Sequence, residues 1–167
     1  NVERAIANLK HNAVLDPARI ATMPTVELAE LIRPSGYFRL KAGRLQAVAS
    51  WWLEHVRDNR LHPARQTLAQ WRESLLRVHG VGPETADSIL LYAFGLPTFV
   101  IDAYTRRIMA RHASTAPDAG YDELQQWFMS SLPVDAALFN EFHALLVRNA
   151  KEHCRKAACL PGCPLAV

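Results

Sequence analysis

The chain has 167 residues, of which 19 are Lys or Arg and 16 are Asp or Glu, so its formal net charge is +3. Hydrophobic residues make up 50% and charged residues 21%, a composition typical of a folded globular protein and unlike that of a disordered segment. The sequence contains no apolar run near the roughly 18 residues that a membrane-spanning helix needs. We therefore expect a soluble protein of one or two small domains, whose mild charge permits a nucleic-acid partner without requiring one.

All three Cys lie near the end of the chain, at Cys154, Cys159 and Cys163. An odd number of Cys cannot pair evenly, which favours metal or cluster ligation in a reducing compartment over a disulfide framework. The first residues lack the basic segment and apolar core of a signal peptide, and the chain does not begin with Met. We expect a cytoplasmic protein, and the sequence as given has the features of a fragment.

Apolar residues recur at helical spacing along most of the chain, which predicts an all-α protein. At the start Val2, Ile6 and Leu9 share a face, and Asp16 is placed to cap a short helix beginning with Pro17. Further helices are expected from a Thr25 cap to about residue 32 and at about 40–56, 63–77, 84–94, 103–111, 121–131 and 135–153. The last helix is expected to bury Leu138, Phe142, Leu145, Leu146 and Ala150. The short β-type run 98–101 is predicted to be a buried connector.

The segment 78–83, with the sequence VHGVGP, joins two of these helices by a glycine turn. Unpaired N–H groups and the positive dipole end at the start of a helix can bind a phosphate, and glycines let the backbone come close. The proline lacks an N–H, so the candidate donors are those of Gly80, Gly82, Glu84 and Thr85. A hairpin that only packs two helices together is the more common explanation of a bare Gly-x-Gly turn, so the wider context must decide.

Two segments together resemble the helix-hairpin-helix DNA glycosylases of the endonuclease III, or HhH-GPD, superfamily. They are 75–90 (LLRVHGVGPETADSIL) and 99–107 (FVIDAYTRR). The resemblance implies the all-α glycosylase fold, with its hairpin motif at about 68–94 gripping the DNA backbone and a catalytic aspartate at Asp102. In that family, a lysine in the second hairpin helix marks the members that also cut the strand. Glu84 stands at that position here, so the resemblance implies a monofunctional enzyme that releases a base with water.

Three further motifs resemble the branch that contains the bacterial 3-methyladenine DNA glycosylases. They are 31–38 (LIRPSGYF) with Lys41, 84–90 (ETADSIL) and 121–125 (YDELQ). This branch implies an alkylated purine as the substrate, double-stranded DNA as the partner, a monomer with no membrane association, and a place in the bacterial cytosol or nucleoid.

The same resemblance implies how the chain divides into domains. Residues 1–132 would form a helical-barrel domain that contains the hairpin motif. Residues 133–167 would supply the last helix and the cysteine loop of a second, discontinuous domain, whose other helices precede Asn1 in the family. A loop from that earlier part lines the base pocket in family members, so the choice of damaged base is left open by this sequence.

Asp102 precedes a predicted helix, which makes it an ordinary N-cap candidate. A capping aspartate can also face a cleft, where its carboxylate would stabilise an oxocarbenium ion and orient or deprotonate the attacking water. Two unit charges about 4 Å apart interact by roughly 4 kcal/mol at an effective dielectric near 20, equivalent to several hundredfold in rate. An alkylated purine already carries positive charge, so it leaves with less help from a general acid.

Tyr37 lies in the loop that, by the resemblance, inserts into the duplex where the base has left. An aromatic ring there would recover stacking worth roughly 1 to 3 kcal/mol per base. The alternative is a helix-capping aromatic that packs on the core. Candidate phosphate neighbours are Lys41, Arg44, Arg106 and Arg107, although each taken singly is better explained as a solvated surface charge.

The C-terminal segment 154–165 (CRKAACLPGCPL) resembles the loop that holds a 4Fe–4S cluster in many endonuclease III relatives. A cluster needs four thiolates, and Cys154, Cys159 and Cys163 supply three, at a spacing that differs from the usual one. The fourth ligand is expected beyond Val167. Zinc held by the three Cys and His153 is one alternative, and three free thiols are another. In the family the cluster is structural or redox-active, so catalysis would need no metal.

Two other functions stay open. One is a bifunctional endonuclease III-like glycosylase and lyase that acts on oxidised pyrimidines, and Glu84 argues against it. The other is a non-catalytic helix-hairpin-helix module that only binds DNA, and Asp102 beside the connector argues against that.

Overall fold

The computed structural model describes residues 1–57, 66–112, 119–155 and 158–165, and these residues form helices and no β-strand. The predicted all-α class is therefore confirmed. The chain divides into two compact units, Asn1–Val81 and Gly82–Val167. The domain division expected after residue 132 stays a prediction. No helix in the described ranges is both long and apolar enough to cross a bilayer.

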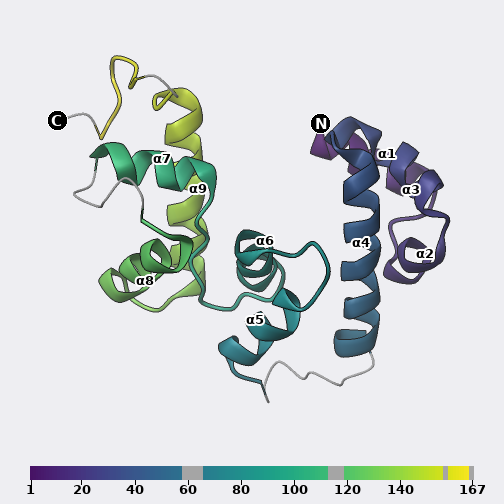
Figure 1. Ribbon diagram of the computed structural model, residues 1–167. Helices are drawn as coiled ribbons and strands as arrows, with labels where there is room; N and C mark the ends of the chain where they lie inside the picture. The colour runs from purple at the N-terminus through teal and green to yellow at the C-terminus, as the bar shows by residue number, and fades with distance from the viewer. Residues whose placement is uncertain (58–65, 113–118, 156–157, 166–167) are drawn as a thin grey trace. The chain divides into compact units, whose positions relative to one another are not determined.

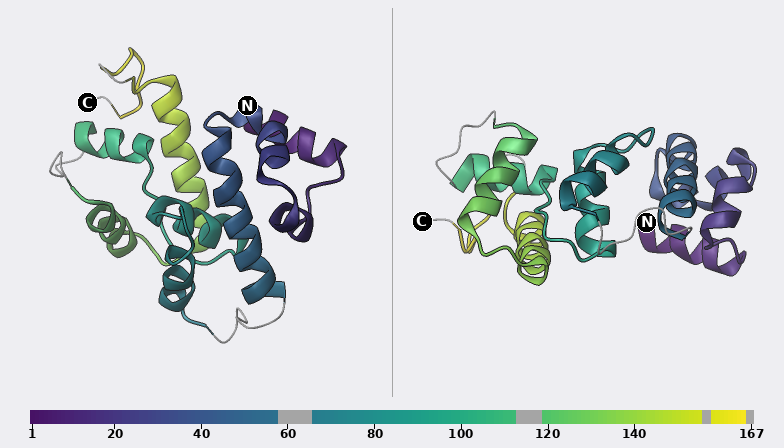
Figure 2. Two further views of the ribbon diagram at one scale, coloured as in Figure 1. Left: turned by 45° about the vertical axis from the view of Figure 1, so that its right-hand side comes forward. Right: turned by 90° about the horizontal axis from the view of Figure 1, so that it is seen from below.

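The first unit is built around one long helix (Figures 1 and 2). It contains α1 (Val2–His11), α2 (Pro17–Thr22), α3 (Thr25–Leu31), the 3-10 turn η1 (Arg33–Ser35), α4 (Phe38–Trp52), the π-helical turn η2 (Leu53–Arg57) and α5 (Leu68–Leu76). Both α2 and α3 pack against α4. Their shared core consists of Ala5, Leu9, Ile20, Leu28, Ala29, Ile32, Ala42 and Ala49.

Two helix caps were predicted in the first unit. The cap of α2 at Asp16 is confirmed, and the cap of α3 at Thr25 is wrong. The Arg19 N–H donates to Asp16 Oδ1 at 2.9 Å, and Pro17 occupies the first turn of α2, as the sequence predicts. Thr25 is not a cap, because it is already the first helical residue of α3 and its hydroxyl donates to Gln46 Oε1 at 2.7 Å. Gln46 is on α4, so Thr25 ties α3 to the long helix.

The helix predicted at 63–77 begins later than expected. α5 starts at Leu68, because Thr67 and Gln70 form a capping box in which each side chain accepts from the other residue's backbone N–H. This box is a local signal that the sequence analysis passed over. Positions 63–65 of the predicted helix lie outside the described residues.

The second unit contains α6 (Pro83–Ser88), the π-helical turn η3 (Ile89–Ala93), α7 (Ala103–His112), α8 (Tyr121–Ser131) and α9 (Ala136–Glu152). Both α7 and η3 pack against α9. Figure 1 shows α7 beside α9. Phe99 is at the centre of the core, stacked on Phe128 at 4.1 Å between ring centroids and edge-on to Phe139 at 5.5 Å. The segment 98–101 is fully buried and forms no strand, which confirms the predicted connector.

A buried polar network fixes the connector in place. The Gln125 side-chain amide donates to Asp87 Oδ2 at 2.9 Å and to the Phe99 carbonyl at 2.7 Å. The Thr98 hydroxyl donates to Asp87 Oδ1 at 3.2 Å. These bonds join α6, the connector and α8 in the protein interior, where paired polar groups specify a single arrangement. The backbone that leads to Asp102 is therefore held from two helices.

The buried faces of the first and last helices match the predicted ones only in part. Leu9, Leu146 and Ala150 are buried as predicted. Val2 and Ile6 on α1 are exposed, although they share the spacing of a buried stripe. On α9 Leu145 is 52% exposed and lines a surface hollow of about 370 Å³, whereas Phe139 and His143 are buried. The neighbouring helices therefore decide which of the apolar side chains are covered.

Candidate active site and cysteine cluster

Asp102 caps α7 with one carboxylate oxygen and presents the other to α9. Its Oδ1 accepts a hydrogen bond from the Thr105 N–H at 2.7 Å, as expected of an N-cap aspartate. Its Oδ2 lies 3.7 Å from His143 Nε2, and the two side chains are only 14% and 10% exposed. The cap therefore holds the carboxylate in a fixed orientation in which one oxygen is free of backbone contacts.

His143 is the residue of this site that the sequence analysis missed. Its Nδ1 is hydrogen-bonded to the Tyr92 hydroxyl at the end of η3. Its Nε2 is buried and has no hydrogen-bond partner among the described residues. In the sequence His143 is one polar residue on an amphipathic helix, without a motif around it. Only the packing of α9 against α7 and η3 brings it to Asp102.

Two carboxyl groups in this region have pKa values displaced in opposite directions. Burial raises the pKa of Asp102, but the His143 imidazole and the Thr105 N–H outweigh burial and bring that pKa below its ordinary value of 3.8. The pKa of Glu84 is raised above 4.5 by partial desolvation of its carboxyl, although the residue as a whole is exposed, and then by the charge of Asp102, against the effects of His143 and Arg106. The carboxyl of Glu84 is thus close enough to Asp102 to sense its charge, and Asp102 stays ionised at neutral pH.

The two glycines of the turn have different conformations. Gly80 has a φ of +81°, which only glycine adopts without strain, and a Cβ there would lie 2.4 Å from Arg44 Cγ. Arg44 on α4 therefore lies directly against the turn. Gly82 is the N-cap residue of α6 with a φ of −97°, and a Cβ there would meet open space. Glu84 and Thr85, in the first turn of α6, are exposed.

Tyr37 is on the surface of the first unit. It is 86% exposed, so it does not pack on the core, and this excludes the alternative interpretation. It is the N-cap residue of α4 and has a left-handed backbone with a φ of +47°, after Gly36 at +67°. A left-handed backbone costs a non-glycine residue about 1 to 2 kcal/mol. The Lys41 ammonium donates to the Ser35 carbonyl at 2.7 Å and so braces this loop.

Two of the four candidate phosphate neighbours are engaged in packing instead. Arg106 donates to the Ala119 carbonyl at 2.9 Å, and Arg107 donates to the Cys154 carbonyl at 2.9 Å. Both arginines are half-buried. Neither is a solvated surface charge, because each satisfies a backbone carbonyl of a segment that packs on α7.

The three cysteines come together with a histidine from α7. Ligand atoms of His112, Cys159 and Cys163 all lie within 4.8 Å of one another. Cys154 is buried, and the Arg111 guanidinium donates to its sulfur at 2.9 Å and lies 3.8 Å from Cys159 Sγ. All three thiols are free of disulfide bonds. Burial raises the pKa of the Cys159 thiol, and the Arg111 guanidinium opposes that effect.

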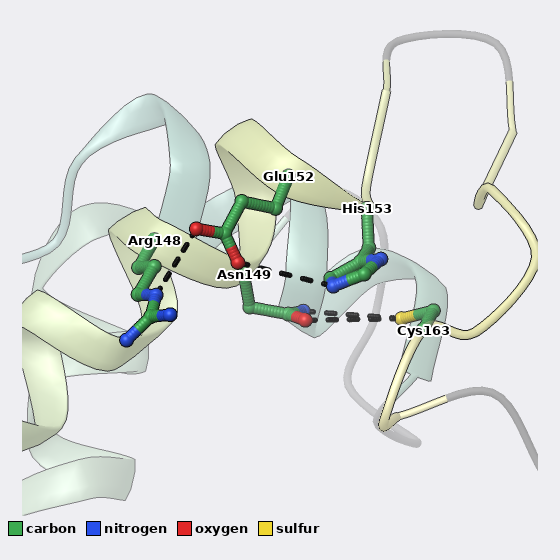
Figure 3. A network of polar contacts seen from close by, with 5 residues as sticks. All are labelled: Arg148, Asn149, Glu152, His153 and Cys163. Atoms are coloured by element: carbon green, nitrogen blue, oxygen red, sulfur yellow. Dashed lines mark hydrogen bonds and ion pairs between the residues drawn. The ribbon is translucent and has the colours of Figure 1, made fainter.

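His153, the predicted zinc ligand, is not part of this group. Its Nε2 lies 3.9 Å from Glu152 Oε2, as Figure 3 shows. Figure 3 also shows Cys163 Sγ beside the Asn149 side-chain amide, at 3.9 Å from Nδ2. The imidazole donor near the cysteines is His112, which the packing of α7 against α9 supplies. The structure therefore replaces His153 by His112.

This donor set fits a metal centre. The ligand atoms of His112, Cys159 and Cys163 are close enough together to bind one metal ion, and the three cysteines of the chain would supply three of the four thiolates of a 4Fe–4S cluster. These residues can therefore hold a metal.

The family model described as "HhH-GPD superfamily base excision DNA repair protein" matches residues 1–134. The chain therefore belongs to the HhH-GPD superfamily of base excision DNA repair proteins, which confirms the resemblance found in the sequence. The fold and the relatives below place it among the DNA repair glycosylases of that superfamily.

Three relatives illustrate this placement. The chain is 42% identical over 167 residues to a Methanocaldococcus jannaschii protein named "Putative DNA repair glycosylase", with 99% of this chain and 76% of that protein covered. The structure of H. pylori 3-methyladenine DNA glycosylase bound to 1,N6-ethenoadenine matches with 28% identity and a TM-score of 0.73, covering 89% of this chain and 76% of that one. A non-covalent endonuclease III–DNA complex shares the fold, with 24% identity, a TM-score of 0.73 and coverage of 90% and 66%. The chain thus spans between 66% and 76% of these relatives.

Proposed function

We propose that this protein is a monofunctional DNA glycosylase that hydrolyses the N-glycosidic bond of an alkylated purine flipped out of duplex DNA. The observation that carries the proposal is the state of Asp102. Its carboxylate is ionised, and the hydrogen bond from the Thr105 N–H to Oδ1 orients it. The other oxygen, Oδ2, has no backbone donor among the described residues. A fixed negative charge of this kind stabilises the positive charge that develops on the sugar as the base leaves.

The chemistry proceeds by hydrolysis. As the bond between C1′ and the base nitrogen breaks, the electron pair leaves with the base and the sugar becomes an oxocarbenium ion. Asp102 stabilises that ion and orients the attacking water, whose oxygen bonds to C1′ while its proton passes to the carboxylate. An alkylated purine that carries a positive charge leaves as a neutral base. This substrate class therefore needs no general acid to protonate the leaving base.

Glu84 accounts for the absence of strand cutting in the proposal. A lyase forms a Schiff base between an amine and C1′, and a carboxyl group cannot do so. Glu84 is in the second hairpin helix and senses the charge of Asp102, so the carboxyl occupies the region in which the family's lysine would act. The product of the proposed enzyme is an intact strand with an abasic site.

The exposed turns supply the proposed contacts with DNA. The backbone at Gly80, Gly82, Glu84 and Thr85 would hold a phosphate, and open space at Gly82 supports a close approach. The ring of Tyr37 would fill the gap that the flipped base leaves, which its exposure supports. The protein would act on the duplex as a monomer in the cytoplasm.

We further propose that Cys154, Cys159 and Cys163 hold a 4Fe–4S cluster that stabilises the C-terminal loop and takes no part in hydrolysis. When bound, the cluster would supply cross-linking of the loop to α9 and a redox-active centre. Iron, sulfide and zinc contents of anaerobically purified protein test this. About four iron and four sulfide per chain are expected. One zinc per chain would instead indicate a site completed by His112, and protein without metal would contradict the proposal.

A panel of lesions tests the substrate. Duplexes that carry 3-methyladenine, an oxidised pyrimidine or only normal bases are incubated with the full natural chain, and the free base is quantified by chromatography. The proposal predicts release of the alkylated purine above all. Preferential release of the oxidised pyrimidine would contradict the substrate class, and tight binding without release of any base would indicate a non-catalytic DNA-binding module.

A further inference from the structure

We propose that His143 is a positioning residue for Asp102, and that Tyr92 sets the tautomer in which His143 acts. This inference rests on the proposed role of Asp102 in base release. The hairpin and the connector are already assigned to the proposed active site. This inference adds α9 to it, through His143.

The Tyr92 hydroxyl determines where the imidazole carries its proton. A phenolic O–H donates well to an unprotonated ring nitrogen, and here it faces His143 Nδ1. The neutral ring then carries its proton on Nε2. Burial and the charge of Asp102 both raise the pKa of Tyr92, so the phenol keeps the proton that it donates. The N–H that results is directed toward α7.

The Nε2 of His143 faces one atom that can use this proton. Asp102 Oδ2 lies 3.7 Å away, and no other described group is bonded to Nε2. This separation is longer than a hydrogen bond by less than 1 Å, and catalytic hydrogen bonds are often long before the substrate arrives. A small shift of either side chain would complete the bond.

The two oxygens of Asp102 then have separate roles. The Thr105 N–H holds Oδ1, which leaves Oδ2 without a backbone donor in the described ranges and turned toward His143. An N–H from His143 beside Oδ2 fixes the rotation of the carboxylate and favours its ionised form. Burial alone would favour the protonated form of Asp102. The contact with His143 therefore helps to keep the carboxylate ionised.

The apolar packing of the second unit does not require a histidine at this position. His143 is on the buried face of α9, edge-on to Phe99 at 6.4 Å between ring centroids. A leucine would satisfy the same apolar neighbours. An imidazole with an unpaired buried nitrogen destabilises a fold, and such groups in native proteins commonly serve a function.

The titratable and charged groups around the pair come from α6, η3 and α7. Glu84 on α6 and Tyr92 on η3 sense the charge of Asp102, and Arg106 on α7 opposes the effect of Asp102 on Glu84. His143 also lowers the pKa of Glu84. A change at His143 is therefore expected to alter both carboxyl groups, and Asp102 more directly because its Oδ2 lies 3.7 Å from His143 Nε2.

The test compares His143→Leu with His143→Gln. The glutamine amide reaches the position of Nε2 and donates a hydrogen bond, whereas leucine only fills the space. We expect His143→Leu to slow single-turnover base release by about 10- to 100-fold, the loss of one charge-assisted hydrogen bond, and to move the acid limb of the pH profile to higher pH. His143→Gln should restore most of the rate. An unchanged pH profile in His143→Leu would overturn the proposal.

Tyr92→Phe and Tyr104→Phe form a matched pair for the tautomer. Both remove one phenolic hydroxyl, although Tyr92 is 47% exposed and Tyr104 is half-buried. Tyr104 is on α7, and its ring faces Arg107 and Lys151. Tyr92→Phe should slow release by about 2- to 10-fold, because the imidazole loses its preferred tautomer. Tyr104→Phe should leave the rate unchanged. Equal effects of the two substitutions would contradict the role of Tyr92.

A direct titration separates this inference from the proposed function. The pKa of Asp102 is followed by carbon NMR of the labelled carboxyl in wild type and in His143→Leu, with thermal unfolding as the check on folding. We expect the pKa to rise in the variant, and no change would overturn the inference. A raised pKa in a protein that releases no base would refute the proposed function while the coupling of His143 to Asp102 stands.

Discussion

Asp102 and Tyr37 both precede a helix as its N-cap residue, but their surroundings differ in almost every respect. Asp102 is 14% exposed, with one oxygen on the Thr105 N–H and the other facing His143. Tyr37 is 86% exposed and has a left-handed backbone. A buried carboxylate is stable only among partners, whereas an exposed ring needs no partners until DNA arrives. The comparison indicates that substitutions can separate chemistry from DNA contact in this protein.

Substitution of Asp102 should have the largest effect. Asp102→Asn keeps a good N-cap but removes the negative charge, so base release should slow by roughly several hundredfold while DNA binding persists. The measurement is a single-turnover rate of base release. Asp135→Asn is the matched control, because Asp135 caps α9 through the Leu138 N–H at 2.6 Å. A similar loss in both variants would contradict a specific role for the charge of Asp102.

Substitution of Tyr37 should affect DNA and leave folding intact. Tyr37→Ala removes an exposed ring, so affinity for a duplex with an abasic site should fall by about 5- to 150-fold, the equivalent of 1 to 3 kcal/mol of stacking. Tyr37→Gly should lose the same affinity and also gain up to about 1 kcal/mol of unfolding free energy, because the left-handed strain is relieved. Unchanged affinity in both variants would contradict a wedge at this position.

The two glycines of the turn should respond differently. Gly80→Ala places a Cβ at positive φ against Arg44, and should lower the free energy of unfolding by about 1 to 2 kcal/mol. Gly82→Ala should cost no more than about 1 kcal/mol but should weaken DNA binding, since the Cβ projects into open space at the proposed phosphate site. Denaturant unfolding and binding titrations measure both. Equal DNA affinity for Gly82→Ala and wild type would contradict the phosphate site.

The smallest effect is expected at Glu84, in the dependence of stability on pH. The folded-state pKa of Glu84 is raised above 4.5, so its contribution to stability is fully present below pH 4.5 and is lost as the pH rises through the folded value. Glu84→Gln should therefore be more stable than wild type at neutral pH, and the difference should vanish below pH 4.5. Denaturant unfolding at several pH values measures this, and a constant difference would contradict the shift.

The sequence predicted those features that depend on neighbouring residues. The cap at Asp16, the cap at Asp102 and the buried connector 98–101 follow from local chemistry and are found as predicted. His143 and His112 could not be predicted, because the packing of α7 against α9 brings together residues far apart in the chain. The exposure of the Tyr37 side chain could not be predicted either, since an aromatic ring at a helix cap can pack on the core or extend into solvent.

The central claim is that base release at Asp102 leaves the strand intact, and one assay tests it most directly. The full natural chain is incubated with a duplex that carries the damaged base which the enzyme releases best. Free base and strand breaks are then measured on the same sample, with and without alkali and with borohydride. The account predicts free base, breaks only after alkali and no covalent adduct with borohydride. Breaks without alkali together with a trapped adduct would show that an amine attacks C1′, and would contradict the role given to Glu84.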